Sequence, residues 1–441
     1  MVDNSFYEEP NIKNKSNNLQ GGVFIKYLIA PKPILGRDMS VMAYCFRHEA
    51  AHSYVTDAPS RAMDGVVALP GLQILEDIGL NAFTNGSALF VPVSHFSLLS
   101  DLTTQCSQPP DKVIFLLDGK FPPEEPFLSE VKKLIDKGYS FAIENVTDFD
   151  KMHPVVELCK FIMMGFRFNM NNLELFNKVS PRYKKHIFIA TEVNSTETYD
   201  ELQKTSFYYF EGRFYNLPVP TGDNTIAPVK VNRIHLLNIV REDDFDIEEV
   251  VKVVSRDPSM SISLLKLVNS PHLGISTQIK GIQQAVALLG QEEVRKWVST
   301  AIAGLLAEDK PSELTRLALL RAKFAENMAP HFQMAMHANS LFLMGLFSVL
   351  DAALNMSMKD ALDVVKVSDD VYEALVSNTG VFAPVLNFIR AYEAAHWTEC
   401  KNVLAVHEID AGDVFMAYIN TAEWYDIIVS TVIDENDIED N

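Results

Sequence analysis

The chain has 441 residues, and its 38 Lys and Arg against 58 Asp and Glu give a net charge of −20 when His is neutral. This excess of acid excludes a protein that binds nucleic acid or anionic lipid mainly through charge, because its surface repels both. A hydrophobic content of 48% with 22% charged residues excludes wholesale disorder. At roughly 150 residues per domain, the length predicts two or three domains with cores of their own.

The cysteines indicate the redox environment. They are widely spaced and form no CxxC pair, so we expect neither a disulfide framework nor a cysteine zinc site, and a reducing compartment fits best. The four are Cys45, Cys106, Cys159 and Cys400. The N-terminus carries Glu8 and Glu9 and no apolar core, which predicts a cytoplasmic protein without a secretory signal.

The first half of the chain alternates between two patterns. Residues 1–20 are rich in Asn and Lys and are predicted to form a disordered arm. In residues 21–220, short β-like runs alternate with helical patterns such as 126–137, which favours an α/β domain with a mainly parallel sheet, naturally closed as a barrel. The predicted strands are 23–29, 41–46, 88–93, 112–117, 140–143, 160–164 and 186–190.

The second half changes class. Two prolines, a glycine and turn formers after Leu217 predict a linker, which we place at 221–228. In residues 229–441 the apolar residues recur at spacings of three and four, which predicts an all-helical domain. Residues 246–269 predict two helices around Asp257-Pro258, and 434–441 form an acidic tail. The most apolar window, 334–358, contains Asp351 and is interpreted as a buried helix, not a membrane segment.

One string satisfies a metalloprotease pattern. His48-Glu49-Ala50-Ala51-His52 matches HExxH, which on a helix would place two histidines on one face for Zn²⁺. The preceding residues from Val41 have the pattern of a strand, and the extended motif is absent, since Val55 and Ala58 stand where Gly and His would be needed. We therefore interpret the histidines as ordinary. No glycine-rich phosphate loop or GxSxG nucleophile motif is present, so the residues alone show no strong catalytic constellation.

Several segments of the first half stand in an informative order: 30–34, 41–49, 75–79, 90–94, 113–119, 138–145 and 209–218. In sequence and spacing they resemble the landmarks of EAL domains, the TIM-barrel phosphodiesterases of the bacterial second messenger cyclic di-GMP. Downstream, 257–270 and 285–297 resemble the HDOD domain, an all-helical relative of HD hydrolases. The chain therefore resembles EAL-HDOD tandem signalling proteins, with a TIM-like (β/α) barrel followed by an HDOD domain at 229–441.

The EAL resemblance implies two divalent cations held by oxygen ligands, which activate a water for attack on a phosphodiester. In our alignment most of the ligand positions have lost their oxygen donors, and only Glu144 and Glu211 keep a carboxylate. At one position the aligned residue is either Thr191 or the adjacent Glu192. The degenerate positions are Cys45, Pro92, Leu116, Glu144, Asn145, Met163, Gly165, Thr191 and Glu211.

Two further departures concern the ligands. The family's substrate-contacting Gln falls at Lys32 and its Arg at Glu49, an acid that would repel phosphate. In the helical domain, the metal-binding His-Asp pair of HD hydrolases becomes Ser348-Val349, as HDOD domains commonly lack it. We therefore expect no catalytic residue, no metal and no cofactor.

Three interpretations remain open. The favoured one is a catalytically inactive protein that acts by binding protein partners through the HDOD domain. The resemblance implies roles in motility, biofilm or surface attachment. The second is a receptor that binds cyclic di-GMP without hydrolysing it, with Lys32 as a phosphate contact. The third is an active metal-dependent phosphodiesterase. We expect no nucleic-acid partner and no membrane insertion, and the oligomeric state is left open.

Overall fold

The structure, a computed structural model, describes residues 27–50, 70–84, 86–100, 102–166, 171–219, 228–240, 245–269 and 278–432. The predicted arm at 1–20, the predicted acidic tail at 434–441 and nearly all of the predicted linker at 221–228 lie outside the described residues.

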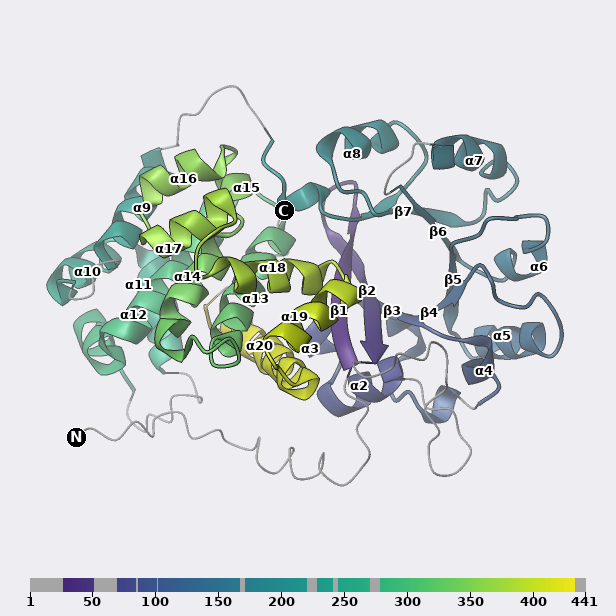
Figure 1. Ribbon diagram of the computed structural model, residues 1–441, viewed down its shortest axis with the longest axis horizontal. Helices are drawn as coiled ribbons and strands as arrows, with labels where there is room; N and C mark the ends of the chain where they lie inside the picture. Colours follow the sequence, from purple (N-terminus) through teal and green to yellow (C-terminus); the bar gives the residue numbers. More distant parts are fainter. Residues whose placement is uncertain are drawn as a thin grey trace.

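The first half of the chain is a closed barrel. Its strands follow one another in chain order around the barrel (Figure 1). They are β1 (Tyr27–Gly36), β2 (Val41–Ala50), β3 (Ala88–Pro92), β4 (Val113–Asp118), β5 (Ser140–Glu144), β6 (Phe161–Gly165), β7 (Ile187–Thr191) and β8 (Tyr209–Glu211). Strand β1 is antiparallel to both β2 and β8, and every other neighbouring pair is parallel. This confirms the predicted barrel of mainly parallel strands.

The barrel strands are short and apolar because both of their faces are covered. In β4, the residues from Val113 to Leu117 are all buried, as expected of a parallel strand between an inner core and an outer layer of helices. The inner core takes alternate residues of successive strands. It consists of Ile34, Ala43, Cys45, Phe90, Ile114, Leu116, Ala142, Phe161, Met163 and Ile189.

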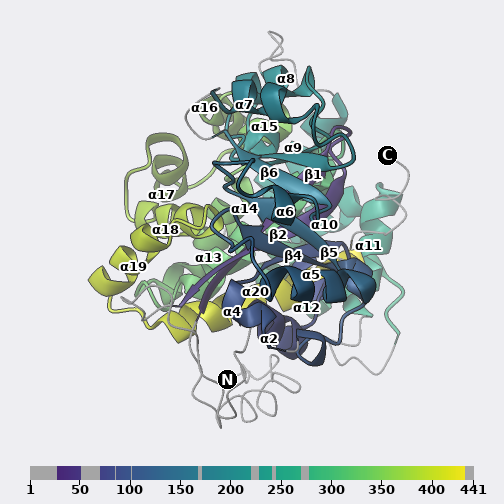
Figure 2. The same cartoon turned by 90° about the vertical axis from the view of Figure 1, so that its right-hand side faces the viewer.

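Helices follow most of the parallel strands and cover the outside of the barrel. They are α2 (Pro70–Ile78), α3 (Asn81–Thr84), α4 (His95–Leu98), α5 (Phe127–Asp136), α6 (His153–Val156), α7 (Asn171–Val179) and α8 (Thr196–Gln203), with the short turns η2 (Leu102–Thr104), η3 (Pro110–Lys112) and η4 (Phe214–Asn216). In Figure 2, α5 and α6 lie toward the viewer, on the side of the barrel away from the helical domain. The predicted helix at 126–137 is confirmed as α5.

The second half of the chain is helical, as predicted. Its elements are α9 (Pro228–Val240), α10 (Ile247–Val254), α11 (Pro258–Val268), α12 (Ile282–Leu306), α13 (Ser312–Met328), η6 (Ala335–His337), α14 (Ala338–Phe347), α15 (Leu350–Leu354), α16 (Met358–Val365), α17 (Asp369–Tyr372), η7 (Glu373–Ser377), α18 (Ala383–Glu393), α19 (Trp397–Val406) and α20 (Ala411–Val432). The predicted turn at Asp257-Pro258 separates α10 from α11, because the Asp257 side chain accepts a bond from the Met260 N–H and Pro258 occupies the first turn of α11.

The apolar window 334–358 is not the single buried helix that we predicted. It divides into η6, α14 and α15, and the break between α14 and α15 falls at Val349, whose φ of −123° is not helical. The Ser348 hydroxyl donates to the Gly345 carbonyl at 2.7 Å, and Arg321 donates to the Ser348 hydroxyl at 3.0 Å. These side-chain bonds compete with helix continuation, which hydropathy alone does not reveal.

The helical domain packs against the barrel at β1. Helices α18 and α20 pack against β1, and α20 also packs against α3 (Figure 1). Strand β1 pairs with β8 only over Ile34 to Gly36, so its earlier residues lack a second strand neighbour. There the Ile29 N–H donates to the Tyr392 hydroxyl of α18 at 3.1 Å. The Tyr392 hydroxyl of the helical domain thus accepts a hydrogen bond from a backbone N–H at the edge of the barrel sheet.

A buried polar cluster joins the two domains at β2. The Tyr44 hydroxyl donates to Glu313 Oε2 at 2.7 Å, and Arg316 Nη1 donates to Glu313 Oε1 at 3.0 Å. Arg316 Nη2 also donates to the Phe83 carbonyl at 2.9 Å, and its guanidinium lies 4.6 Å from the centre of the Tyr44 ring. Tyr44, Glu313 and Arg316 are at most 5% exposed, so these charges are paired away from water.

Candidate functional site

The sequence-predicted site residues gather at one mouth of the barrel, where the parallel strands end. Cys45, Leu116 and Met163 are part of the inner barrel core. Glu144, Gly165, Thr191 and Glu211 are the last residues of β5, β6, β7 and β8, and Pro92 is the last residue of β3. Because the carboxyl ends of barrel strands carry the active site in enzymes of this architecture, this mouth is the candidate site.

An ion pair spans the mouth from β2 to β5. Nη1 and Nη2 of Arg47 donate to Oε1 and Oε2 of Glu144, both at 2.8 Å. The two side chains are 23% and 17% exposed. A bidentate pair of this geometry engages both oxygens of the carboxylate. Glu144, one of two predicted site residues that retain a carboxylate, is therefore committed to a cation of the chain itself.

A second pair lies beside it. Lys32 Nζ of β1 is 3.8 Å from Glu211 Oε1, and the Glu211 side chain is 4% exposed. Lys32 is opposite Cys45 in the β1–β2 register. Burial raises the pKa of the Cys45 thiol to about 12, with Arg47 and Lys32 opposing the shift and Glu144 and Glu211 adding to it. Cys45 is therefore a protonated thiol.

The remaining predicted positions offer few side-chain oxygen atoms that could bind a metal ion. Pro92 and Gly165 have no side-chain oxygen, and Thr191 is 7% exposed. Asn145 is exposed, has a positive φ of 58°, and donates from Nδ2 to Asp118 Oδ2 at 3.0 Å. Glu192, the alternative residue at the Thr191 position, follows β7 and has a φ of 59°. Its Oε2 lies 3.0 Å from the place where a Cβ of residue 165 would be, so its carboxylate lies beside Gly165.

These residues do not fit the two divalent cations that the EAL resemblance implies. Hard cations need several oxygen ligands each, and the carboxylates of Glu144 and Glu211 face Arg47 and Lys32 instead. Within the described residues, no three His, Cys, Asp or Glu side chains are grouped as a metal site would require. The guanidinium and the ammonium supply positive charge where the family would place metal ions.

Arg47 is the site residue that the sequence reasoning missed. Its signal was available, because Ala43 and Cys45 face the barrel interior and alternation along β2 places Arg47 on the same face. The residue lies inside the string that drew attention as HExxH, two positions after the aligned Cys45. Its partner could not be found this way, because Glu144 is 97 residues further along the chain.

The described part of the HExxH string, His48 to Ala50, does not form the helix that a zinc site of this type requires. Strand β2 continues through His48 to Ala50, so these residues are extended and not helical. Burial, followed by the nearby charge of Arg47, lowers the pKa of His48 to about 4. The second histidine, His52, lies outside the described residues.

In the helical domain, an arginine–glutamate ion pair lies beside the position of the lost His-Asp pair. Ser348, aligned with the His, accepts from Arg321 Nη1 at 3.0 Å, and Val349 is buried. Arg321 Nη2 donates to Glu393 Oε2 at 2.7 Å and its Nε to both Glu393 oxygens at 2.9 and 3.0 Å. As in the barrel, an arginine–glutamate pair occupies the neighbourhood of the predicted degenerate site.

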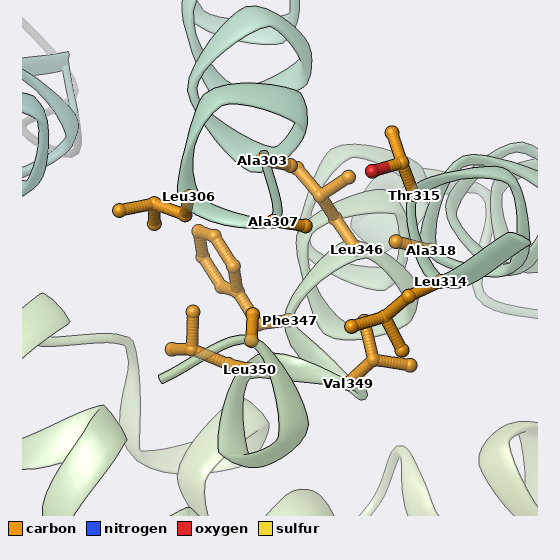
Figure 3. Close-up of a pocket in the computed structure, with 11 residues that line it drawn as sticks. Ala303, Leu306, Ala307, Leu314, Thr315, Ala318, Leu346, Phe347, Val349 and Leu350 are labelled. Atoms are coloured by element: carbon orange, nitrogen blue, oxygen red, sulfur yellow. The ribbon is translucent and has the colours of Figure 1, made fainter. Parts of the chain in front are cut away.

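A small cavity lies close by, between α12, α13, α14 and α15. Its volume is about 20 Å³, and Figure 3 shows side chains such as Leu314, Leu346 and Phe347 around it, with Thr315 the one labelled residue that has a polar side chain. A buried water needs two to four polar partners, so this lining is that of a packing defect and not of a ligand site.

None of the described helices combines the length and the apolar character needed to cross a bilayer.

The fold and the mouth define a two-domain chain in which a closed α/β barrel precedes a helical domain. Within that second domain, residues 227–370 match the HDOD domain family. The predicted HDOD resemblance and the predicted fold class are thereby confirmed.

Two curated proteins are similar to most of the chain, at 25–27% identity. Over 350 residues, covering 79% of this chain and 80% of the relative, it is 27% identical to the cyclic di-GMP phosphodiesterase CdgJ of Vibrio cholerae. Over 412 residues it is 25% identical to the uncharacterized protein YuxH of Bacillus subtilis, covering 91% of this chain and 98% of that protein. The crystal structure of the FimX EAL domain is similar over 46% of this chain and 93% of that one, at 15% identity and a TM-score of 0.33.

Proposed function

We propose that this chain is a signalling protein of the cyclic di-GMP network that acts by binding another protein and does not hydrolyse a phosphodiester. The observation that carries the proposal is the barrel mouth, where Glu144 and Glu211 face Arg47 and Lys32. The other aligned ligand positions are Cys45, Pro92, Leu116, Asn145, Met163, Gly165 and Thr191.

The physical reason is the balance of charge in the mouth. A two-metal phosphodiesterase gathers carboxylates so that their negative charge holds the cations, which then activate water. In this chain each of the two carboxylates already faces a positive side chain. A divalent cation would have to break the bidentate Arg47–Glu144 pair and would then meet a neutral thiol at Cys45.

A hydrolysis assay tests the proposal. The full chain is incubated with cyclic di-GMP and Mg²⁺ or Mn²⁺, and the products are separated by chromatography. We expect no linear dinucleotide above the rate without protein. Product that forms with the wild type and disappears in Glu144→Gln would refute the proposal and support an active phosphodiesterase, the activity named for the relative CdgJ.

A second candidate is a receptor that binds cyclic di-GMP without hydrolysing it. The favouring observation is the pair of cations at the mouth, because the side chains of Lys32 and Arg47 are 22% and 23% exposed and can reach a phosphate. Calorimetric titration decides between the candidates. Micromolar binding that weakens in Lys32→Ala and Arg47→Ala, but not in the control Lys204→Ala, an exposed residue at the end of α8, would establish the receptor.

For the partner, we propose a surface of the helical domain near η6. Met336 and Val381 are 94% and 54% exposed, and their sequence neighbours His337 and Phe382 have ring centroids 5.6 Å apart. Exposed apolar side chains that lie close together are typical of protein-binding sites. From the EAL-HDOD resemblance, we propose motility, biofilm formation or surface attachment as the regulated process.

The partner is sought with the full chain, because the two domains share a buried interface. Tagged protein is used for capture from native extract, and bound proteins are identified by mass spectrometry. We expect one specific partner to be lost in the double variant Met336→Lys, Val381→Lys and retained in the control Val406→Lys, a residue 77% exposed on α19. A partner lost only in Leu99→Lys, on the barrel, would place the interaction elsewhere.

A further inference from the structure

The end of the barrel opposite the mouth carries a concentration of positive charge. Residues 178–186, from the last turn of α7 to the start of β7, contain four cations and no Asp or Glu, in a chain whose net charge is −20. These cations are Lys178, Arg182, Lys184 and Lys185, and all four are exposed. Because the parallel strands begin at this end, residues that precede neighbouring strands lie together here.

The strand register joins this segment to Lys160 on one side. Lys160 immediately precedes β6, and its carbonyl accepts a hydrogen bond from the Ile187 N–H at 3.0 Å. Phe161 and Ile187 are paired residues of β6 and β7. Since neighbouring strands lie about 4.8 Å apart, the exposed Lys160 and the lysines before β7 belong to one surface.

On the other side of β7 the surface continues to β8 and β1. Gly36 of β1 is paired with Tyr209 of β8, which places Arg37 beside Tyr208. Arg37 Nε donates to the Phe207 carbonyl at 2.9 Å, and its guanidinium lies 5.9 Å from the centre of the Tyr208 ring. Tyr208 is 64% exposed. We name this surface the barrel base, and it consists of Arg37, Lys160, Lys184, Lys185 and Tyr208.

The positive charges of the barrel base are not neutralised by acids of the described chain. Within the residues that the structure describes, no Asp or Glu forms an ion pair with any of its four cations. The neighbouring Arg182, by contrast, is paired, with Nη1 2.5 Å from Asp150 Oδ1. Asp38, next to Arg37 in sequence, accepts from the Ser40 hydroxyl at 2.7 Å. The barrel base therefore keeps four positive charges on one exposed surface.

A surface of this kind fits an acidic partner. Exposed cations attract opposite charge over about 8 Å at physiological ionic strength. A short acidic segment can stay within that range of the barrel base, whereas a long polyanion extends over the acidic remainder of the chain and is repelled. The exposed Tyr208 ring adds the aromatic contact that is enriched in protein interfaces. We propose that the barrel base binds an acidic segment of a partner protein.

This surface is separate from the two sites described above. It lies where the parallel strands begin, whereas the mouth lies where they end, and the surface near η6 belongs to the helical domain. In Figure 1, β6 and β7 are on the side of the barrel away from the helical domain. The proposal therefore does not depend on the proposed function.

The test titrates a labelled oligoglutamate peptide into the full chain and follows fluorescence anisotropy, with oligoglutamine of the same length as the reference. We expect saturable binding that weakens at least about tenfold between about 50 mM and about 300 mM sodium chloride, because salt shortens the range of the attraction. The double variant Lys184→Glu, Lys185→Glu should weaken binding at least about tenfold, since two attractive charges become repulsive. The control Lys252→Glu, Arg256→Glu makes the same change in net charge at exposed positions of the helical domain and should bind as the wild type does.

The same proteins separate the alternatives. The double variant should unfold at the temperature of the wild type, because both lysines are exposed, and Lys160→Glu decides if it does not fold. The proposal is overturned if oligoglutamate binds no better than oligoglutamine, or if the base variant and the control weaken binding equally. Tighter binding of a single-stranded oligonucleotide of equal charge, lost in the base variant, would overturn it in favour of nucleic acid. Self-association of the full chain that is lost in the base variant would overturn it in favour of a second copy.

Discussion

The buried cluster between the domains gives the most direct test of how they are joined. In Glu313→Ala, the Arg316 guanidinium loses its carboxylate partner and the Tyr44 hydroxyl loses its acceptor at 2.7 Å. Arg316 is 5% exposed and cannot recover its solvation in water. Removing one partner of a buried ion pair costs about 3–5 kcal/mol, because the other charge is left uncompensated.

The expected loss can be measured by urea unfolding and by the unfolding temperature. For a chain of 441 residues that unfolds as one unit, the entropy of unfolding is roughly 0.9 kcal/mol/K, so the melting temperature should fall by about 3–5 °C. Tyr44→Phe removes one bond to a charged acceptor and should cost about 1.5–3 kcal/mol.

The matched control is Glu130→Ala, which removes a surface partner 2.6 Å from Lys133 on α5. Exposed pairs contribute only about 0–1 kcal/mol. If Glu313→Ala costs no more than Glu130→Ala, the cluster does not hold the domains together. Two separate unfolding transitions in the wild type would likewise contradict a shared interface.

Three further predictions concern the barrel. Arg47→Met should lower the free energy of unfolding by roughly 1–3 kcal/mol, because it leaves Glu144 without its bidentate donor, and a urea midpoint unchanged from wild type would refute the pairing. The folded chain lowers the pKa of His48 to about 4 from an ordinary 6.5, so the contribution of this residue to the free energy of unfolding is fully present above pH 6.5. As the pH falls toward 4 the unfolded chain takes up a proton that the folded chain does not, and up to about 3 kcal/mol is lost; His48→Phe should lose correspondingly less. Cys45, with its pKa raised to about 12, should resist iodoacetamide in the native protein at about pH 8 and react after unfolding, as read by peptide mass spectrometry.

Much of the fold was accessible from sequence because it depends on local patterns. The apolar runs of β4 to β7, the periodicity of α5 and the turn at Asp257-Pro258 all follow from neighbouring residues. The aligned site positions lie at one mouth of the barrel because they stand at or near the ends of its strands, and strand alternation fixes which side chains face inward.

What the sequence could not show is pairing between distant residues. Arg47 and Glu144 are separated by 97 positions, and Tyr44 and Glu313 by 269. Neither contact leaves a periodic signal, since each depends on how the barrel closes and how the second domain packs on it. Hydropathy also joined η6, α14 and α15 into one helix, because it does not register the bonds that end a helix at Ser348.

The covering of β1 by α18 and α20 also affects how the chain is made. The ribosome delivers all the barrel strands before it reaches α20, which ends at Val432. Until then the outer face of β1 and the Ile29 N–H have no cover, so a nascent barrel carries an apolar, hydrogen-bonding edge of the kind that chaperones shield. The packing of the barrel is therefore completed only after α18 and α20 have been synthesised.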